Sequence, residues 1–180
     1  MKREEVEQVR QEAVAILQRA NIVLSEPERS SMEVADFGLN DIRNLGLEIV
    51  VYENNDRYCA KELVLFPRQM CPQHRHPRVS ATNPGKRETF RCRWGEVYLY
   101  VEGEATADPR AVVPARYRPY VSVWREIILR PGQQHTLEAG TLHWFQAGDQ
   151  GAIVSEFSST SMDETDVFTD PNIKRAPVIS

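Results

Sequence analysis

The chain has 180 residues, of which 41% are hydrophobic, and this length suits one globular unit with a substantial buried core. The 22 Lys and Arg residues and 26 Asp and Glu residues give a formal net charge of -4, without a basic stripe carrying interleaved aromatic residues, so nucleic acid is not an expected partner. The N-terminal residues are charged, and no apolar run reaches about 18 residues, so we expect no membrane span and a cytoplasmic protein.

The first predicted element is an amphipathic helix from Glu4 to Ala20. Its apolar residues recur every three or four positions and form one stripe, namely Val6, Val9, Ala13, Ile16 and Ala20. Ser25 to Pro27 ends this helix, and a second short helix is predicted from Asp36 to Asn44, with Gly46 as its C-terminal stop. Residues 1–46 are therefore predicted to form a helical arm. Its apolar stripe must be covered, either by its own barrel or by a partner in a symmetric homodimer.

After Gly46 the sequence changes to short runs of β-branched and aromatic residues. The predicted strands, in one-letter code, are LEIVVYE, YCAKELVLF, VYLYVEG, VSVWREIILR, HTLEAG, HWFQAG and AIVSEFSS. Turn signals separate them, such as NN at Asn54, NPG at Asn83, PG at Pro131 and AGDQG at Ala147. Because no helical periodicity lies between the strands, residues 47–180 are predicted to form an all-β antiparallel sandwich or barrel, the jelly roll included.

Two further segments have no predicted strand of their own. The segment from Ala105 to Pro119 is rich in Pro and Arg and is predicted to be a long surface loop. The tail from Ser158 to Ser180 is polar and acidic, which on composition alone predicts a solvated extension. The three cysteines form no CxxC pair and are predicted to be buried or partly buried free thiols: Cys59, Cys71 and Cys92.

The strongest chemical signal is His74 and His76, which lie one residue apart between Pro72 and Pro77. On a strand, side chains at i and i+2 point to the same face with Cα atoms roughly 6.5 to 7 Å apart, so both imidazoles can bind one ion. Taken alone, a His-x-His pair is more often ordinary polar surface. The pair therefore indicates a metal site only together with other donors.

Two other residues supply such donors. The NPG turn at Asn83 can reverse the chain and bring Glu88 beside the histidines on the neighbouring strand, and LEAGTLHWF places His143 on an apolar strand. Three imidazoles and one carboxylate, with no thiolate at matching spacing, suit Mn, Fe, Co, Ni or Zn with open positions for a substrate. The fourth histidine, His135, is predicted to lie in a turn and is left out of the set.

These motifs resemble the two metal-binding motifs of the cupin superfamily. The matching residues are His74-x-His76, Glu88 followed by Gly95, Pro131-Gly132, and Gly140-Thr141-Leu142-His143. Eleven residues separate His76 from Glu88, more than in many cupins. Within cupins, the chain most resembles the D-lyxose isomerase family from about Gly46 onward, through Lys86-x-Glu88 and the sequence SEFSSTSMDETDVFTDPNIKRAP.

The resemblance implies a cupin double-stranded β-helix, or jelly-roll barrel, and a sugar isomerase that uses one divalent metal ion. Manganese is the ion most often used, and Co²⁺, Fe²⁺, Ni²⁺ and Zn²⁺ are alternatives. The implied ligands are His74, His76, Glu88 and His143. The implied sugar-facing residues are Lys86 and Glu156, with Asp166 and Arg175 on a segment that closes over the barrel mouth. The implied reaction interconverts D-lyxose and D-xylulose, or D-mannose and D-fructose, through a cis-enediol.

Aldose–ketose isomerisation also requires a base that is not a metal ligand, because a ligating carboxylate loses basicity. Glu156 fits this role best, and Lys86 points the same way as Glu88 if the segment is extended, so it can donate to a sugar oxygen. Two alternatives stay open: an Fe(II) cupin dioxygenase with the same ligands, and a non-catalytic sugar-binding cupin. The partners expected are a small sugar and a second copy of the chain in a homodimer.

Overall fold

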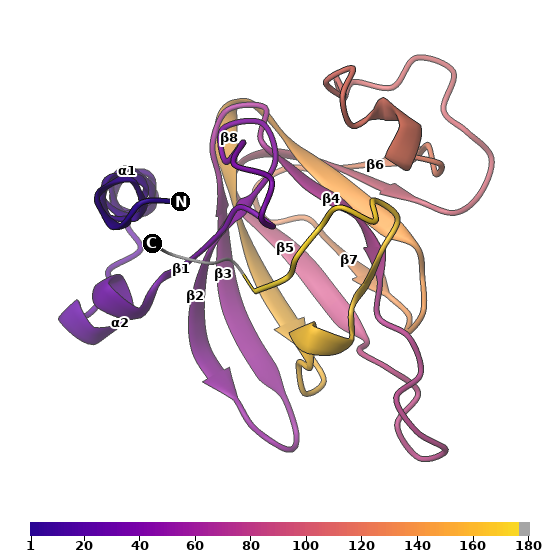
Figure 1. Ribbon diagram of the computed structural model, residues 1–180, viewed down its shortest axis with the longest axis horizontal. Coiled ribbons are helices and arrows are strands. Elements are labelled where there is room, and N and C mark those ends of the chain that lie inside the picture. Colours follow the sequence, from indigo (N-terminus) through magenta and orange to yellow (C-terminus); the bar gives the residue numbers. More distant parts are fainter. Residues whose placement is uncertain (177–180) are drawn as a thin grey trace.

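A computed structural model describes residues 1–176 of the protein (Figure 1). Two α-helices and two 3-10 helices are present in this range: α1 (Arg3–Arg19), α2 (Glu26–Ser31), η1 (Arg118–Tyr120) and η2 (Asp163–Thr165). The strands are β1 (Glu33–Ala35), β2 (Leu47–Asn54), β3 (Cys59–Leu65), β4 (Met70–Arg75), β5 (Glu88–Val101), β6 (Arg125–Leu129), β7 (Gln134–Leu137), β8 (His143–Ser158) and β9 (Val167–Phe168). This order confirms the predicted all-β barrel with helices at its N-terminal end.

The two longest strands organise the barrel. β5 and β8 pair antiparallel from Glu88 opposite Ser158 to Val101 opposite His143. The other edge of β8 pairs first with β4 and then with β3, while β5 also pairs with β6 and β7. Every pairing between named strands is antiparallel, as the turn-separated strands predict. Both long strands therefore bend around the barrel and connect its two ends.

Helix α1 covers the outer face of its own sheet. Its apolar stripe is buried in a cluster with Val34, Val50, Val64 and Ile153, separate from the cluster that fills the barrel interior. Figure 1 shows α1 and α2 beside β1 and β2, at one side of the barrel. This arrangement uses the apolar stripe within the protomer. The division into an arm of residues 1–46 and a barrel of residues 47–180 stays a prediction.

The predicted helix from Asp36 to Asn44 is wrong, because these residues form turns. The second helix is α2 instead, and it begins where the sequence pattern predicted only a break. Ser25 caps it, since the Ser25 Oγ accepts a bond from Glu28 N and the Glu28 side chain accepts one from Ser25 N. This capping box satisfies free N–H groups of the first turn.

The AGDQG signal at Ala147 also has a different form from the one predicted. It lies within β8, where residues 148–151 stand opposite the single residue 96 of β5, so it is a wide bulge that does not end the strand. Gly151 adopts a φ of +87°, and an added Cβ would lie 2.6 Å from Leu65 O, so this position requires glycine.

The remaining expectations concern the loop and the cysteines. The segment of residues 105–119 is irregular, as predicted, but Val113 and Tyr117 anchor it in the barrel core. Cys59, Cys71 and Cys92 are buried free thiols, which confirms the prediction. Within residues 1–176, no helix combines the length and the apolar character that crossing a membrane requires.

Candidate metal centre and active site

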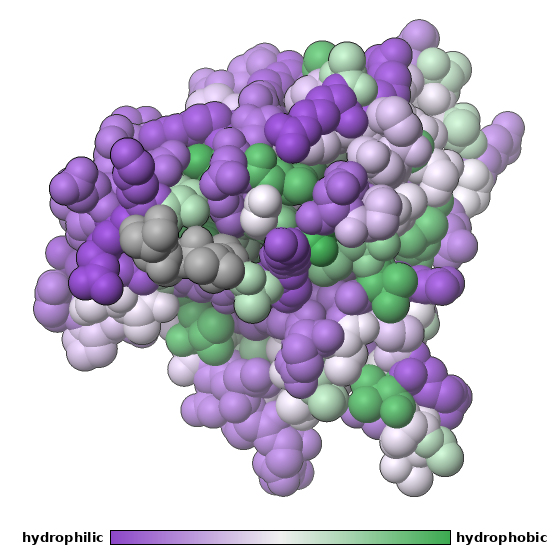
Figure 2. Space-filling view, viewed as in Figure 1, coloured by the Kyte–Doolittle hydropathy of each residue, from purple (hydrophilic) through white to green (hydrophobic). Residues whose placement is uncertain are grey.

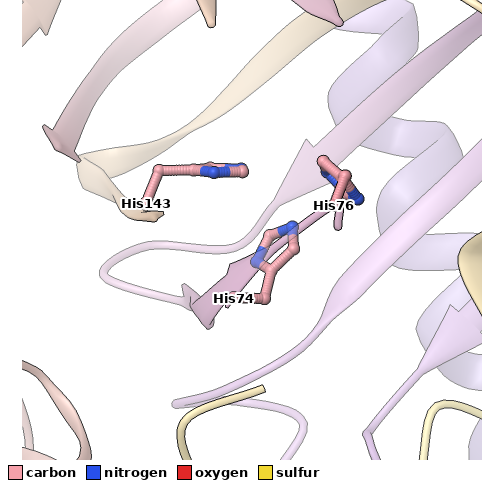
Figure 3. Close-up of side chains that lie close together, drawn as sticks. All are labelled: His74, His76 and His143. Carbon is pink, nitrogen blue, oxygen red and sulfur yellow. The ribbon is translucent and has the colours of Figure 1, made fainter. Parts of the chain in front are cut away.

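Three histidines meet inside the barrel. His74 on β4 stands directly opposite His143 on β8, and His76 follows one residue after the end of β4. Their ligand nitrogens all lie within 4.8 Å of one another, and all three side chains are buried. Figure 3 shows the three imidazole rings gathered around a common space. The His-x-His pair and the distant third histidine therefore form one cluster, as the sequence predicts.

The Nδ1 atom of each imidazole makes a hydrogen bond to an oxygen atom of the chain. The partners are Pro72 O at 2.9 Å for His74, Asp166 Oδ1 at 2.5 Å for His76, and Thr141 O at 2.9 Å for His143. A carbonyl or carboxylate oxygen only accepts, so each Nδ1 carries the proton. Each Nε2 is then the ring nitrogen left to bind a metal ion, although His76 Nε2 also lies 3.0 Å from Glu88 Oε1. An oxygen partner at Nδ1 is typical of metal-binding histidines.

Glu88 completes the donor set. Its Oε1 lies 3.0 Å from His76 Nε2 and 3.1 Å from His143 Nε2. The prediction that Glu88 lies on the strand next to the histidine pair is wrong, because β5 pairs with β8 and not with β4. The curvature of the barrel brings Glu88 to the cluster instead. The structure therefore brings together all four predicted ligands.

The residues present fit a divalent ion. His143 Nε2 is fully buried and makes no hydrogen bond, although Glu88 Oε1 lies 3.1 Å away. A buried nitrogen lone pair facing a carboxylate oxygen is unfavourable unless a proton or a cation lies between them. Three imidazole nitrogens, with the Glu88 carboxylate beside two of them, suit Mn²⁺, Fe²⁺, Co²⁺, Ni²⁺ or Zn²⁺.

Burial and neighbouring charges shift the pKa values of these groups. Burial lowers the pKa of His74 well below its usual value, and the neighbouring histidines lower it further. Burial also disfavours charge on His76, but Glu88 and Asp166 outweigh burial and raise its pKa to about 9. Burial opposes ionisation of Glu88, yet Lys86 and His76 hold its pKa well below the usual range. A metal ion and a proton compete for His76 Nε2.

Lys86 links the candidate metal centre to a second carboxylate. Its Nζ lies 2.7 Å from Glu88 Oε2 and 2.5 Å from Glu156 Oε1, and all three side chains are buried. Burial disfavours the ammonium, but Glu156 and Glu88 outweigh burial and raise the pKa of Lys86 well above its usual value. Ser158 Oγ also donates to Glu156 Oε1, at 3.3 Å. Among residues 1–176, no group donates to Glu156 Oε2.

Within the described residues, the predicted C-terminal tail is not a solvated extension; its residues 177–180 lie outside the described part of the chain. Residues 159–176, which we name the closing segment, cross the front of the barrel in Figure 1. Asp166 accepts the hydrogen bond from His76, and the Phe168 ring stacks on His74 with ring centroids 5.4 Å apart. Arg175 pairs with Glu33 of β1 instead of lying free. Asp166 and Arg175 therefore both reach the barrel mouth, as the closing-segment prediction requires.

Three of the four candidate ligands, His74, His76 and Glu88, line one pocket that is open to solvent at its mouth. The surface around the closing segment is mostly hydrophilic with small hydrophobic patches (Figure 2). The lining of the pocket also includes the following aromatic and charged residues: Phe37, Lys61, Lys86, Phe90, Glu156, Asp163, Asp166, Phe168 and Arg175.

Sequence reasoning missed Lys61 and Asp163. The signal for Lys61 was present, because it alternates with Leu63 and Leu65 on the inward face of β3, where a lysine needs a specific partner. Asp163 carried no such signal. It lies in the acidic run DETD, whose members look equivalent until the tail is placed on the barrel.

Comparison with known proteins identifies the family. Residues 26–180 match the family model described as D-lyxose isomerase. The D-lyxose ketol-isomerase of a Thermofilum species is 59% identical over 177 residues, which are 98% of each chain. The D-lyxose/D-mannose isomerase of Thermosediminibacter oceani is 58% identical over 179 residues, 99% of this chain and 98% of that protein.

A solved structure shares the fold at low sequence identity. A mutant of Acinetobacter sp. DL28 L-ribose isomerase in complex with L-ribose superposes with a TM-score of 0.80. The match covers 99% of this chain and 98% of that chain, at 15% sequence identity. The family model and the two relatives span nearly the whole barrel and all four candidate ligands. The chain belongs to the D-lyxose isomerase family.

Proposed function

We propose that the protein is a metal-dependent aldose–ketose isomerase that interconverts D-lyxose and D-xylulose. Two relatives that cover nearly the whole chain are named for D-lyxose, and one of them also for D-mannose, so D-mannose and D-fructose are the second substrate pair. The observation that carries the proposal is the acid–base pair beside the histidine cluster. A buried lysine bridges a candidate ligand, Glu88, and a carboxylate outside the ligand set, Glu156.

The ligands in this proposal are His74, His76, Glu88 and His143, and the ion is Mn²⁺, with Co²⁺, Fe²⁺, Ni²⁺ and Zn²⁺ as alternatives. When bound, a divalent ion supplies Lewis acidity that stabilises the negative charge developing on the sugar oxygens at C1 and C2. The three imidazoles are fixed by their Nδ1 partners, so the site needs little reorganisation to bind the ion.

Glu156 is the proposed base. Lys86 and Ser158 both engage its Oε1, which leaves Oε2 available to take the proton from C2 of the aldose and return it to C1. The cis-enediol forms between these two transfers, and the hydroxyl proton of O2 moves to O1, so that the carbonyl group passes from C1 to C2. Lys86 holds Glu156 in place and keeps a positive charge beside the sugar oxygens. Asp166 and Arg175, which also line the pocket, are proposed to face the rest of the sugar.

The protein is also proposed to act as a homodimer. Its helix α1 buries its apolar stripe within its own protomer, so a dimer must use another surface. Several large apolar side chains on β2, the β2–β3 turn and β8 remain exposed, namely Val51, Tyr52, Tyr58 and Phe157. Sedimentation of the purified protein tests this part of the proposal separately from the chemistry.

Proton exchange tests the reaction directly. The purified protein is incubated with D-lyxose and Mn²⁺ in D₂O without oxygen, and the sugars are followed by NMR. We expect D-xylulose to form, with deuterium at C2 of the recovered aldose. Failure to turn over without oxygen, with turnover restored by oxygen and Fe(II), supports the dioxygenase alternative. Binding of the sugar without deuteration supports the non-catalytic alternative.

A further inference from the structure

Four charged side chains fix the closing segment to the barrel, and Asp163 lies at their centre. Lys61 Nζ of β3 lies 3.1 Å from each carboxylate oxygen of Asp163. Arg175 Nη2 donates to Asp163 Oδ2 at 2.8 Å, and Arg175 also pairs with Glu33 of β1. Asp163 therefore joins the beginning and the end of the closing segment to two strands.

Because Lys61 is buried, its ammonium group needs a counter-charge. Only 4% of Lys61 is exposed, and its strand position is opposite Glu156. A buried ammonium destabilises the fold unless a counter-charge and hydrogen-bond acceptors surround it. Asp163 supplies that counter-charge, and Ser161 Oγ accepts a further bond at 2.9 Å. Burial opposes ionisation of Asp163, but Lys61 and Arg175 outweigh burial and hold its pKa well below the usual range.

A short path leads from Asp163 to the histidines. The backbone N–H of Asp166 donates to Asp163 O at 3.3 Å, and Asp166 Oδ1 then accepts the bond from His76. Two residues further on, Phe168 stacks on His74. Because only a few residues separate Asp163 from these contacts, fixing Asp163 also fixes the groups that orient two candidate ligands.

We propose that Asp163 is a positioning residue that holds the closing segment against the metal site through Lys61 and Arg175. Its role is to keep the Asp166 carboxylate in place as the hydrogen-bond acceptor for His76 Nδ1. The inference rests on the metal site of the proposed function. The proposed role includes no direct contact between Asp163 and the sugar. Asp163→Asn should therefore change the metal affinity, whereas loss of a substrate-binding residue would change the KM for the sugar.

Metal binding to the metal-free protein tests the role. Mn²⁺ is titrated into wild-type protein and into Asp163→Asn by calorimetry, and amide hydrogen exchange of residues 160–168 is followed in the same samples. We expect the Mn²⁺ affinity of Asp163→Asn to fall about tenfold or more. We also expect faster exchange in the closing segment and unchanged exchange in β5. The matched control is Asp149→Asn, which removes an exposed Asp–Arg pair with Arg68 and should change neither quantity.

Making the same substitution in an Asp166→Ala protein separates positioning from general destabilisation. If Asp163 acts through Asp166, Asp163→Asn should cause little further loss of Mn²⁺ affinity in an Asp166→Ala protein, because coupled residues are not additive. Glu33→Gln is a milder variant that loosens only Arg175. It should cause a smaller loss of affinity, and it keeps the test valid if Asp163→Asn does not fold.

The outcomes are distinguishable. A wild-type protein that binds no metal overturns the proposed function itself. Wild-type binding with unchanged affinity in both Asp163→Asn and Glu33→Gln overturns the positioning role. An equal loss of affinity with and without Asp166 also overturns it. A higher KM for D-lyxose with unchanged metal affinity and unchanged exchange would assign Asp163 to the sugar instead.

Discussion

His76 donates from Nδ1 to Asp166 Oδ1 at 2.5 Å, so the C-terminal part of the chain directly supports a candidate metal ligand. The two residues lie 90 positions apart in the sequence. The Asp166 carboxylate fixes the ring orientation of His76 and increases the basicity of its Nε2. The closing segment thus contacts the candidate metal site and also lines the pocket.

Replacing Asp166 should weaken metal binding. In Asp166→Ala, His76 loses the acceptor behind its ring, so we expect the Mn²⁺ affinity to fall by about 10- to 100-fold. Calorimetric titration of the metal-free protein measures this change. Glu164→Ala is the matched control, because Glu164 is exposed on the same segment. Equal affinities in the wild type and Asp166→Ala would show that His76 is oriented by something else.

Removing His143 should abolish the site. His143 Nε2 is a buried nitrogen, and it has no hydrogen-bond partner among the described residues. We expect His143→Ala to lose stoichiometric Mn²⁺ and isomerisation together, as measured by elemental analysis and turnover. His135→Ala is the control, since His135 on β7 lies outside the cluster of three histidines. A His143→Ala protein that retains both metal and turnover would contradict the ligand assignment.

Glu156→Gln should separate chemistry from metal binding. The amide keeps the size of the side chain but removes the basic carboxylate, so we expect kcat to fall by roughly 10² to 10⁴ with little change in KM. Metal content should remain at the wild-type level. Glu96→Gln, which alters the pair with Arg130 outside the pocket lining, is the control.

Two other results for Glu156→Gln would redirect the mechanism. A rate near that of the wild type would mean that another group, such as Glu88, removes the proton. Loss of metal would mean that Glu156 is a ligand or supports one, and the four-ligand site would have to be redrawn.

The three clustered histidines could be identified as candidate ligands from the sequence because each has a local signal. His74 and His76 share a strand face, and His143 follows a Gly-Thr turn on an apolar strand. The strands were predictable for the same reason, since β-branched runs and turn residues are local features. The pairing partner of β5 was not predictable, because barrel closure depends on contacts between distant strands.

The errors have physical reasons. The turns of residues 36–44 contain helix-compatible residues, but Phe37 and Leu39 pack into the barrel interior and tertiary packing decides their conformation. The acidic closing segment looks solvated in the sequence because the positive groups that pair with Asp163, Lys61 of β3 and Arg175 at the end of the same segment, meet it only in the folded structure. Composition reports the charges of a segment but not the surface that neutralises them.

The last prediction concerns Glu48, a buried carboxylic acid on β2 outside the pocket. Glu48 is 0% exposed and lies in register between Val34 and Val64, on the sheet face that α1 covers. Its Oε1 accepts one bond from Gln69 Nε2 at 3.1 Å, and its Oε2 has no partner among the described residues. Burial raises its pKa from 4.5 to about 8, and the bond from Gln69 offsets only part of this effect.

The raised pKa makes stability depend on pH. The folded protein holds the Glu48 proton more tightly than the unfolded chain, so the contribution is most favourable below about pH 4.5 and is lost as the pH rises to about 8. A difference of this size corresponds to roughly 5 kcal/mol once both states are ionised. Glu48→Gln stays neutral and keeps the acceptor for Gln69, so it should avoid this loss.

We therefore expect Glu48→Gln to match the wild type in thermal stability near pH 5 and to exceed it near pH 9. At the alkaline pH the difference in Tm should be roughly 10 to 20 °C for a domain of this size. Comparing the two proteins at each pH cancels the titration of all other groups. Glu53→Gln is the control, because Glu53 is exposed on the same strand and should give no pH-dependent difference. If Glu48→Gln is instead destabilised equally at both pH values, Glu48 is ionised in the folded protein and its charge is compensated there, with Arg43 as the nearest source of positive potential.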